Sequence, residues 1–343
     1  MDKRYVDRAI EEMQWLLSIP SPSGFTLEIS EKLTAHLREM GFETRQSCKG
    51  SVLACLGGTG RPLVLAAHVD TLGAMVRAVK PNGRLRVCRV GGLNFNSVEG
   101  ENCLVHTRDG KCYTGVLQTV HPAAHVHKDY LSLERNDENM EVLLDENVHT
   151  QEETRALSIS AGDFVSFDPR TVVTPSGYIK SRHLDDKASA GVLLGLAHMV
   201  REQALRLNRR VYILFTTYEE VGHGGAAGLP EDMEEFISVD MGCVGEDLGC
   251  DETMVSICAS DNGGPYDYTV TTDLINTAKR LQLKYAVDIY PSYGSDVNVA
   301  LRAGHEIRHG LIGPGVFASH AYERTHRSGI ENTLALLNGY VAE

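Results

Sequence analysis

The chain has 343 residues, of which 42% are hydrophobic and 23% are charged, a composition typical of an ordinary globular protein. Its 33 basic and 46 acidic side chains give a formal net charge of −13, which repels polyanions and disfavours nucleic acid or an anionic membrane as a partner. No window approaches the roughly 18 apolar residues of a membrane span, and residues 1–19 lack the apolar core of a signal peptide, so we expect a cytoplasmic protein.

Two amphipathic helices are predicted at the start of the chain, over residues 1–19 and 26–40. Gly41 follows the second helix in the position where glycine commonly ends a helix. Short apolar runs at residues 51–56 and 63–70 come next, and they are typical of strands in a sheet that is covered on both faces. This order of elements predicts the beginning of an α/β domain.

The pattern changes between residues 76 and 170. Short segments of alternating polarity are separated there by turn signals, such as residues 81–85 (PNGRL) and 108–111 (RDGK). Short strands at such spacing are typical of a small all-β module. We therefore predict an inserted β-rich domain over residues 76–170.

Helices alternate with buried strands again after this insert. Residues 187–203 and 270–282 predict helices, and the apolar runs 211–217 and 237–241 predict strands. The same alternation on both sides of the β-rich segment indicates one interrupted α/β domain. This discontinuous domain is expected to comprise residues 1–75 and 171–343.

Metal-ligand residue types follow several of these predicted strands, and in an α/β sheet functional side chains gather at the carboxyl ends of the strands. His68 and Asp70 are two residues apart and share a face of an extended strand, so a carboxylate can orient a histidine that binds a metal. Asp240 ends the apolar run at 237–241 and suits a hard or borderline divalent ion. These three residues are candidates for a metal site.

Asp185 and Asp186 stand directly before the apolar helix predicted at residues 187–203. Helix capping is the simpler interpretation of this pair, since aspartate is a good N-cap residue. Metal binding by one of the two carboxylates is the alternative.

Glu219 and Glu220 are adjacent at the end of the strand predicted at residues 211–217. Neighbours on a strand point to opposite sides, so the pair would have separate tasks. In a dinuclear hydrolase, one carboxylate would bind a metal and the other would take the proton of the attacking water. A solvated strand end is the alternative interpretation.

These segments, in this order, resemble the M42 family of metallo-aminopeptidases, which includes glutamyl aminopeptidases and TET peptidases and is sometimes labelled as cellulases. The similarity extends over nearly the whole chain. The resemblance implies a zinc-exopeptidase-like mixed sheet covered by helices, with an inserted small β-barrel or PDZ-like dimerisation domain. The segments that carry it are residues 19–24, 106–117, 184–191, 218–222, 293–304 and 317–326.

The resemblance also implies two divalent metal ions per subunit, with zinc expected and cobalt or manganese as alternatives. Asp185 would bridge the ions, because a shared ligand needs two oxygens. The remaining ligands would be His68 and Asp240 on one ion, and Glu220 and His320 on the other.

Two further roles follow from the family resemblance. Glu219 would be the general base that takes a proton from water and passes it to the leaving amine. Asp70 would orient His68.

The sequence departs from the family pattern at two places. Lys187 stands where the family usually has arginine, and lysine lacks the bidentate guanidinium fork. The C-terminal motif, usually His-Ser-Pro-x-Glu, reads HAYER at residues 320–324 here. His326 is therefore a rival to His320 as a ligand.

The implied function is an aminopeptidase that removes N-terminal residues from short peptides. A dimetal deacylase or a peptidase acting on N-blocked substrates is the alternative enzyme, and a non-catalytic assembly or peptide-binding protein is a third hypothesis. Homo-oligomers are expected from the resemblance, with dimers that assemble into a hollow tetrahedral dodecamer.

A second cluster of histidines, His121, His125 and His127, lies in one short window of the predicted insert. Such a cluster can bind a metal. Pro122 and the lack of acidic residues before the cluster favour a solvated loop instead.

Overall fold

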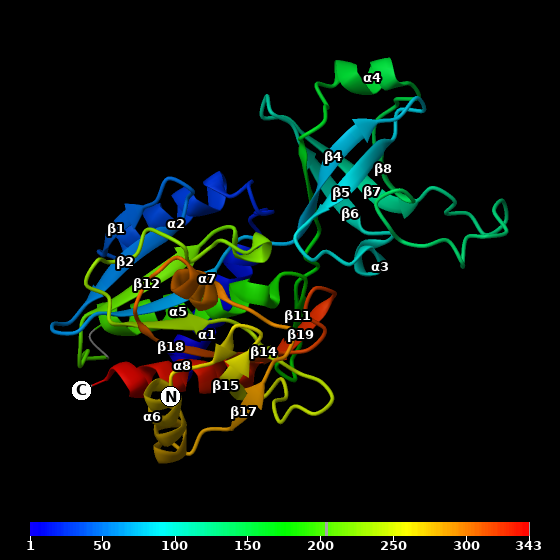
Figure 1. Ribbon diagram of the computed structural model, residues 1–343. Helices are drawn as coiled ribbons and strands as arrows, with labels where there is room; N and C mark the ends of the chain where they lie inside the picture. The colour runs from blue at the N-terminus through cyan, green and yellow to red at the C-terminus, as the bar shows by residue number, and fades with distance from the viewer. Residues whose placement is uncertain (203–204, 343) are drawn as a thin grey trace. The chain divides into compact units, whose positions relative to one another are not determined.

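The computed structural model of the protein describes residues 1–202 and 205–342. The chain forms two compact units, one of Met1–Asp70 with Arg170–Glu343 and the other of Thr71–Pro169. Figure 1 shows the ribbon of both units. Within the described ranges, no helix is both long enough and apolar enough to cross a membrane. The cytoplasmic location expected from the sequence stays a prediction.

A mixed sheet forms the centre of the first unit. Within the described residues it has ten strands: β1 (Glu43–Gln46), β2 (Val52–Gly57), β3 (Leu63–His68), β12 (Val211–Thr216), β13 (Glu235–Val239), β14 (Gly242–Cys243), β15 (Val255–Asp261), β16 (Gly264–Pro265), β17 (Tyr285–Ile289) and β18 (Arg308–Val316). The order is β1-β2-β12-β3-β13-β18-β15-β16, with β14 beside β18 and β17 beside β15. The four neighbours β12, β3, β13 and β18 are parallel to one another.

Side chains on both faces of this sheet are buried. Along β3, Leu63 and Leu65 belong to the larger core, while Val64 and Ala66 belong to a second core on the opposite face, which also includes Val297 and Ala300. This explains the continuous apolar run of β3, since a strand covered on both faces has no solvent side. The helices of the first unit are α1 (Lys3–Leu17), α2 (Leu27–Glu39), α5 (Leu184–Arg201), α6 (Tyr268–Arg280), α7 (Asp296–Arg302) and α8 (Arg327–Val341).

Two smaller elements complete the first unit near the ends of the parallel strands. A short 3-10 helix, η1 (Glu219–Val221), follows β12. A separate sheet contains β10 (Val172–Val173), β11 (Tyr178–Ser181) and β19 (Glu323–His326).

The second unit is built around a closed antiparallel barrel with its own core. Its strand order is β4 (Gly73–Val79), β5 (Leu85–Val90), β8 (Met140–Leu144), β7 (Cys112–Thr119), β6 (Asn102–His106) and β9 (Phe164–Phe167). Closure leaves no unpaired sheet edge, and Val87, Val105 and Leu117 are fully buried in the core. Two short helices, α3 (Phe95–Val98) and α4 (Gln151–Ala156), accompany the barrel.

The predicted fold class, a mixed α/β sheet covered by helices with an inserted small β-barrel, is confirmed. One local prediction is wrong: Glu219 and Glu220 do not lie on a strand. β12 ends at Thr216, and Tyr218 adopts a left-handed φ of 67° that turns the chain into η1. Since a 3-10 helix has about three residues per turn, the two carboxylates are directed apart by roughly a third of a turn and not by the alternation of a strand.

Candidate metal centre

Four neighbouring parallel strands bring polar side chains to one edge of the sheet. His68 is the last residue of β3, and Asp240 directly follows β13. Glu219 and Glu220 lie in η1 after β12, and His320 lies in the loop after β18. Parallel strands end at the same edge, so residues that are far apart in the sequence meet there.

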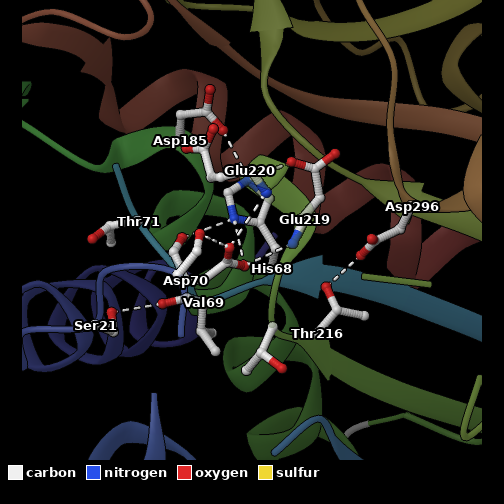
Figure 2. A network of polar contacts seen from close by, with 12 residues as sticks. Ser21, His68, Val69, Asp70, Thr71, Asp185, Thr216, Glu219, Glu220 and Asp296 are labelled. Carbon is white, nitrogen blue, oxygen red and sulfur yellow. Dashed lines mark hydrogen bonds and ion pairs between the residues drawn. The ribbon is translucent and has the colours of Figure 1, made fainter. Parts of the chain in front are cut away.

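Asp185 joins this group from the start of α5 and faces both histidines. Its Oδ1 lies 3.0 Å from Nε2 of His68, a contact drawn in Figure 2, and its Oδ2 lies 3.5 Å from Nε2 of His320. The N-cap position of α5 is His183, and Asp185 has a non-helical ψ of 100°. Each oxygen of Asp185 therefore faces a different part of the cluster, which simple helix capping does not require.

Two sets of potential ligand atoms result, and Asp185 belongs to both. His68, Asp185 and Asp240 form one set, and Asp185, Glu220 and His320 form the other. Within each set, the ligand atoms lie within 4.8 Å of one another. Imidazole nitrogens mixed with carboxylate oxygens suit zinc, cobalt or manganese, so these residues can hold divalent ions.

Burial disfavours the charged form of the carboxylates in this cluster. Burial raises the pKa of Glu219 and of Glu220 well above the ordinary value, and burial raises the pKa of Asp240 to about 7. Burial also acts to raise the pKa of Asp185, but its hydrogen bonds with His320 and His68 lower that pKa below its usual range. Divalent cations at the cluster would neutralise these carboxylates, which is the physical reason for gathering them.

Asp70 contacts both His68 and the backbone of Glu219 and Glu220. Its Oδ1 accepts a hydrogen bond from the backbone N–H of Glu219 at 3.1 Å, and its Oδ2 accepts one from the backbone N–H of Glu220 at 3.3 Å. The hydroxyl of Ser23 donates to Oδ2 at 2.5 Å. The contact with Nδ1 of His68 is made mainly by the backbone oxygen of Asp70, at 3.0 Å against 3.6 Å for the carboxylate (Figure 2).

Glu323 has a similar position on the other side of the cluster, and the sequence patterns did not single it out. Its Oε2 accepts from the backbone N–H of Asp185 and its Oε1 from that of His320, each at 3.1 Å. Burial raises the pKa of Glu323 to about 8. The only sequence signal was the glutamate within the altered HAYER motif.

Lys187, the departure from the family pattern, points away from the ligands. It is buried, and its Nζ donates to the backbone oxygens of Leu16 and Ile19 at 2.9 and 2.8 Å. Leu16 lies in the last turn of α1, and Ile19 follows the end of that helix. Lys187 therefore ties the start of α5 to the end of α1.

Asp296 lies so close to the glycine-rich run after η1 that larger residues would not fit there. It is buried, and the hydroxyl of Thr216 donates to its carboxylate (Figure 2). A Cβ at Gly224 would stand 2.1 Å from Oδ1 of Asp296, and one at Gly225 would stand 2.4 Å from its backbone oxygen. The glycines are needed for this close approach, and burial raises the pKa of Asp296 to about 6.

The histidines left open by the sequence lie in different environments. His320 belongs to a ligand set, whereas Nε2 of His326 contacts the backbone oxygen of Ser176 and Nδ1 accepts from the N–H of Ser328 at the start of α8. In the second unit, His121 contacts Asp129 at 3.0 Å and stacks on His127 with ring centroids 4.3 Å apart and planes 11° from parallel. Ligand atoms of these three residues lie within 4.8 Å of one another, but stacked parallel rings do not direct their in-plane lone pairs to one point.

A cavity of about 480 Å³ adjoins the cluster. It is lined by Asp185, Glu219, Glu220, Asp240 and His320, so the candidate ligands face open space. Its other lining residues include Met241, Cys243, Asn262, Tyr293, Val299 and Arg302. The cavity provides room for a small substrate beside the carboxylates.

Comparison with known proteins shows the family to which the chain belongs. Residues 50–336 match the model of the M42 glutamyl aminopeptidase family. The chain is 47% identical to YhfE of Bacillus subtilis (strain 168) over 338 residues, which is 98% of each protein. A crystal structure of a TET aminopeptidase from a marine sediment archaeon, Thaumarchaeota archaeon SCGC AB-539-E09, has a TM-score of 0.87 at 19% identity, with 98% of this chain and 96% of that chain covered.

A second solved structure is the Pyrococcus horikoshii TET1 peptidase, which can assemble into a tetrahedron or a large octahedral shell. It has a TM-score of 0.84 at 20% identity, with 98% of this chain and 99% of that chain covered. Fold and sequence together define the chain as a hydrolase of peptide bonds, an aminopeptidase. The chain belongs to the M42 glutamyl aminopeptidase family, whose members are metal-dependent.

Proposed function

We propose that the protein is a dimetal aminopeptidase that removes N-terminal residues from short peptides. The position of Asp185 supports two ions best, because its two carboxylate oxygens face two different histidines. His68 and Asp240 would complete the first ion's ligands, and Glu220 and His320 the second's. Zinc is the proposed metal, with cobalt or manganese compatible with the same donors.

Divalent ions at such a site lower the pKa of a bound water and polarise the scissile carbonyl. The chain's own part in the reaction is proton transfer by Glu219. This side chain belongs to neither ligand set, lines the cavity and reaches within 3.8 Å of Nε2 of His68. It takes a proton from the attacking water and delivers it to the leaving amine, and its raised pKa suits a group that must hold the proton in between.

Two carboxylates keep this machinery in position. Asp70 holds the backbone of Glu219 and Glu220, and Glu323 holds the backbone of Asp185 and His320. Preorganised ligands of this kind lose little freedom when an ion binds.

The substrate class is tested with matched chromogenic substrates that carry a free or an acetylated N-terminal amine. Chelation should abolish cleavage, and re-addition of zinc, cobalt or manganese should restore it for the free-amine substrates. Cleavage of the blocked substrates alone would reject the aminopeptidase proposal in favour of a deacylase or a peptidase for N-blocked peptides.

The role of the base is tested by Glu219→Gln. We expect kcat to fall by about 10²–10⁴-fold, the usual contribution of a general acid–base group, while the metal content per chain stays unchanged. Activity equal to that of the original enzyme would reject Glu219 as the base. Loss of metal together with activity would instead assign it to the ligands.

We also propose that the second unit pairs subunits and that the pairs assemble into a larger shell. The Pyrococcus horikoshii TET1 peptidase, which shares the fold, assembles into such a shell.

A further inference from the structure

A second group of metal-ligand side chains lies in the helical layer of the first unit. Oε1 of Glu12 lies 2.9 Å from Nε2 of His36 and 2.7 Å from Nε2 of His198. The potential ligand atoms of all three residues lie within 4.8 Å of one another. Two imidazole nitrogens thus converge on one carboxylate oxygen.

Each residue comes from a different helix: Glu12 from α1, His36 from α2 and His198 from α5. The side chains of Glu12, His36 and His198 are 10%, 28% and 17% exposed, so solvent reaches the group. The positions are well fixed, because α1 and α5 pack closely and the ring of Trp15 lies 4.9 Å from that of His36.

The geometry differs from that of the stacked histidines in the second unit. The rings of His36 and His198 have centroids 6.3 Å apart and planes 67° from parallel, whereas those of His121 and His127 are 11° from parallel. Steeply inclined rings can both direct an in-plane lone pair at one point. The contacts are also comparable with the 3.0 Å between His68 and Asp185.

We propose that Glu12, His36 and His198 bind a zinc-type transition metal ion at a site separate from the candidate metal centre. Two histidines and one carboxylate are a protein ligand set that zinc uses with water in the fourth position. Tetrahedral ligands at roughly 2.0–2.1 Å from zinc stand about 3.3 Å apart, so the set needs to open by about half an ångström. The bound ion ties α1, α2 and α5 together.

Charge around the group favours a cation. Glu39 acts on His36 as a second acidic neighbour, and the whole chain carries a formal net charge of −13. The hydrogen bond with Glu12 raises the pKa of His36, and although burial acts to raise the pKa of Glu12, both histidines lower it to about 2. Protons therefore compete with the ion for His36, and binding strengthens as the pH rises.

Zinc content measures the site directly. The full-length chain is stripped of metal, reloaded with zinc chloride, dialysed and assayed for zinc per chain, in parallel with His36→Asn, His198→Asn and the control His305→Asn. The control histidine belongs to no ligand set among the described residues. We expect each of the first two variants to carry one zinc fewer per chain than the original protein and the control.

A crystal of the unaltered protein, loaded with zinc before crystallisation, provides a measurement that does not depend on how a variant folds. An anomalous peak at the zinc edge is expected between the side chains of Glu12, His36 and His198. Equal zinc content in all four proteins would overturn the proposal and leave a hydrogen-bonded cluster only. No peak at this position, or a peak that appears only after millimolar soaking, would overturn it as well.

Discussion

At the scale of single residues, the candidate metal centre depends on side chains that bind backbone rather than metal. Asp70 and Glu323 each accept hydrogen bonds from two backbone N–H groups, and those four groups belong to Glu219, Glu220, Asp185 and His320. Groups behind metal ligands commonly change metal affinity by about 10–100-fold when they are altered.

Glu323→Gln should therefore weaken metal binding by about 10–100-fold. The amide nitrogen of glutamine cannot accept a hydrogen bond, so one of the two backbone N–H groups, of Asp185 or of His320, loses its acceptor. The activity of the variant is measured as a function of free metal concentration, and most of the original activity should be recovered at saturating metal. The exposed control Glu306→Gln should leave the curve unchanged, and an unaltered curve for Glu323→Gln would refute the positioning role.

Because Lys187 is buried, we expect the free energy of unfolding to rise with pH above about pH 7. Burial lowers its pKa to about 7, from an ordinary value of 10.5, so an unfolded chain binds more protons than the folded chain between these two values. The cost of burying the charge is thus fully present below pH 7 and declines as the pH rises towards 10.5. The free energy of unfolding should gain up to about 1.4 kcal/mol per pH unit from this residue.

Lys187→Met should remove that gain, which is measured as the slope of unfolding free energy against pH in urea. The variant also loses two hydrogen bonds, so its stability is compared as a slope and not as an absolute value. Lys279→Met, at an exposed position of α6, should keep the original slope. A slope for Lys187→Met that equals the original would show that the lysine is not the group responsible.

At the scale of elements, glycines set how closely α1 and α5 pack. A Cβ at Gly191 would stand 2.6 Å from the backbone oxygen of Ala9 and 2.8 Å from Cβ of Met13. A Cβ at Gly195 would stand 2.9 Å from that of Ala9. These contacts are shorter than van der Waals separation, so the helices would have to move apart to accept alanine.

Gly191→Ala should destabilise the protein by about 1–3 kcal/mol through overpacking. Alanine gains about 1 kcal/mol in a helix interior, but the clash with the backbone of α1 cannot be relieved by rotating a side chain. The change is measured by urea unfolding. Gly245→Ala, where nothing lies within 4 Å of the added Cβ, should stay within about 0.5 kcal/mol, and an equally stable Gly191→Ala would contradict the packing argument.

At the scale of the whole molecule, the proposed assembly would determine which substrates can reach the candidate metal centre. A hollow shell would admit only chains small or unfolded enough to enter, which fits short peptides as substrates.

Light scattering on the purified protein should report a mass near twelve times the 37.6 kDa of one chain. The expectation rests on the solved structure of PhTET1-12s, a dodecamer, and on the tetrahedral assembly of the Pyrococcus horikoshii TET1 peptidase. A mass of one or two chains at micromolar concentration would reject the shell. Dissociation of the shell into pairs at high salt would indicate that charged contacts join one pair to the next.

Local patterns in the sequence were sufficient for the α/β class and the inserted β-rich module. Apolar strands covered on both faces have a continuous hydrophobic run, as in β3, and the change to short alternating segments predicts an inserted barrel. Residue types at strand ends also identified His68, Asp70 and Asp240 as candidates, because that position depends only on where an apolar run stops.

The tertiary structure alone decided which of these candidates meet. His320 joins the cluster and His326 caps a helix, although both lie in one short motif, because the chain turns between them. Glu323 acts through its backbone partners, and Glu12, His36 and His198 converge from three helices. Contacts between residues far apart in sequence depend on packing, and no local periodicity encodes them.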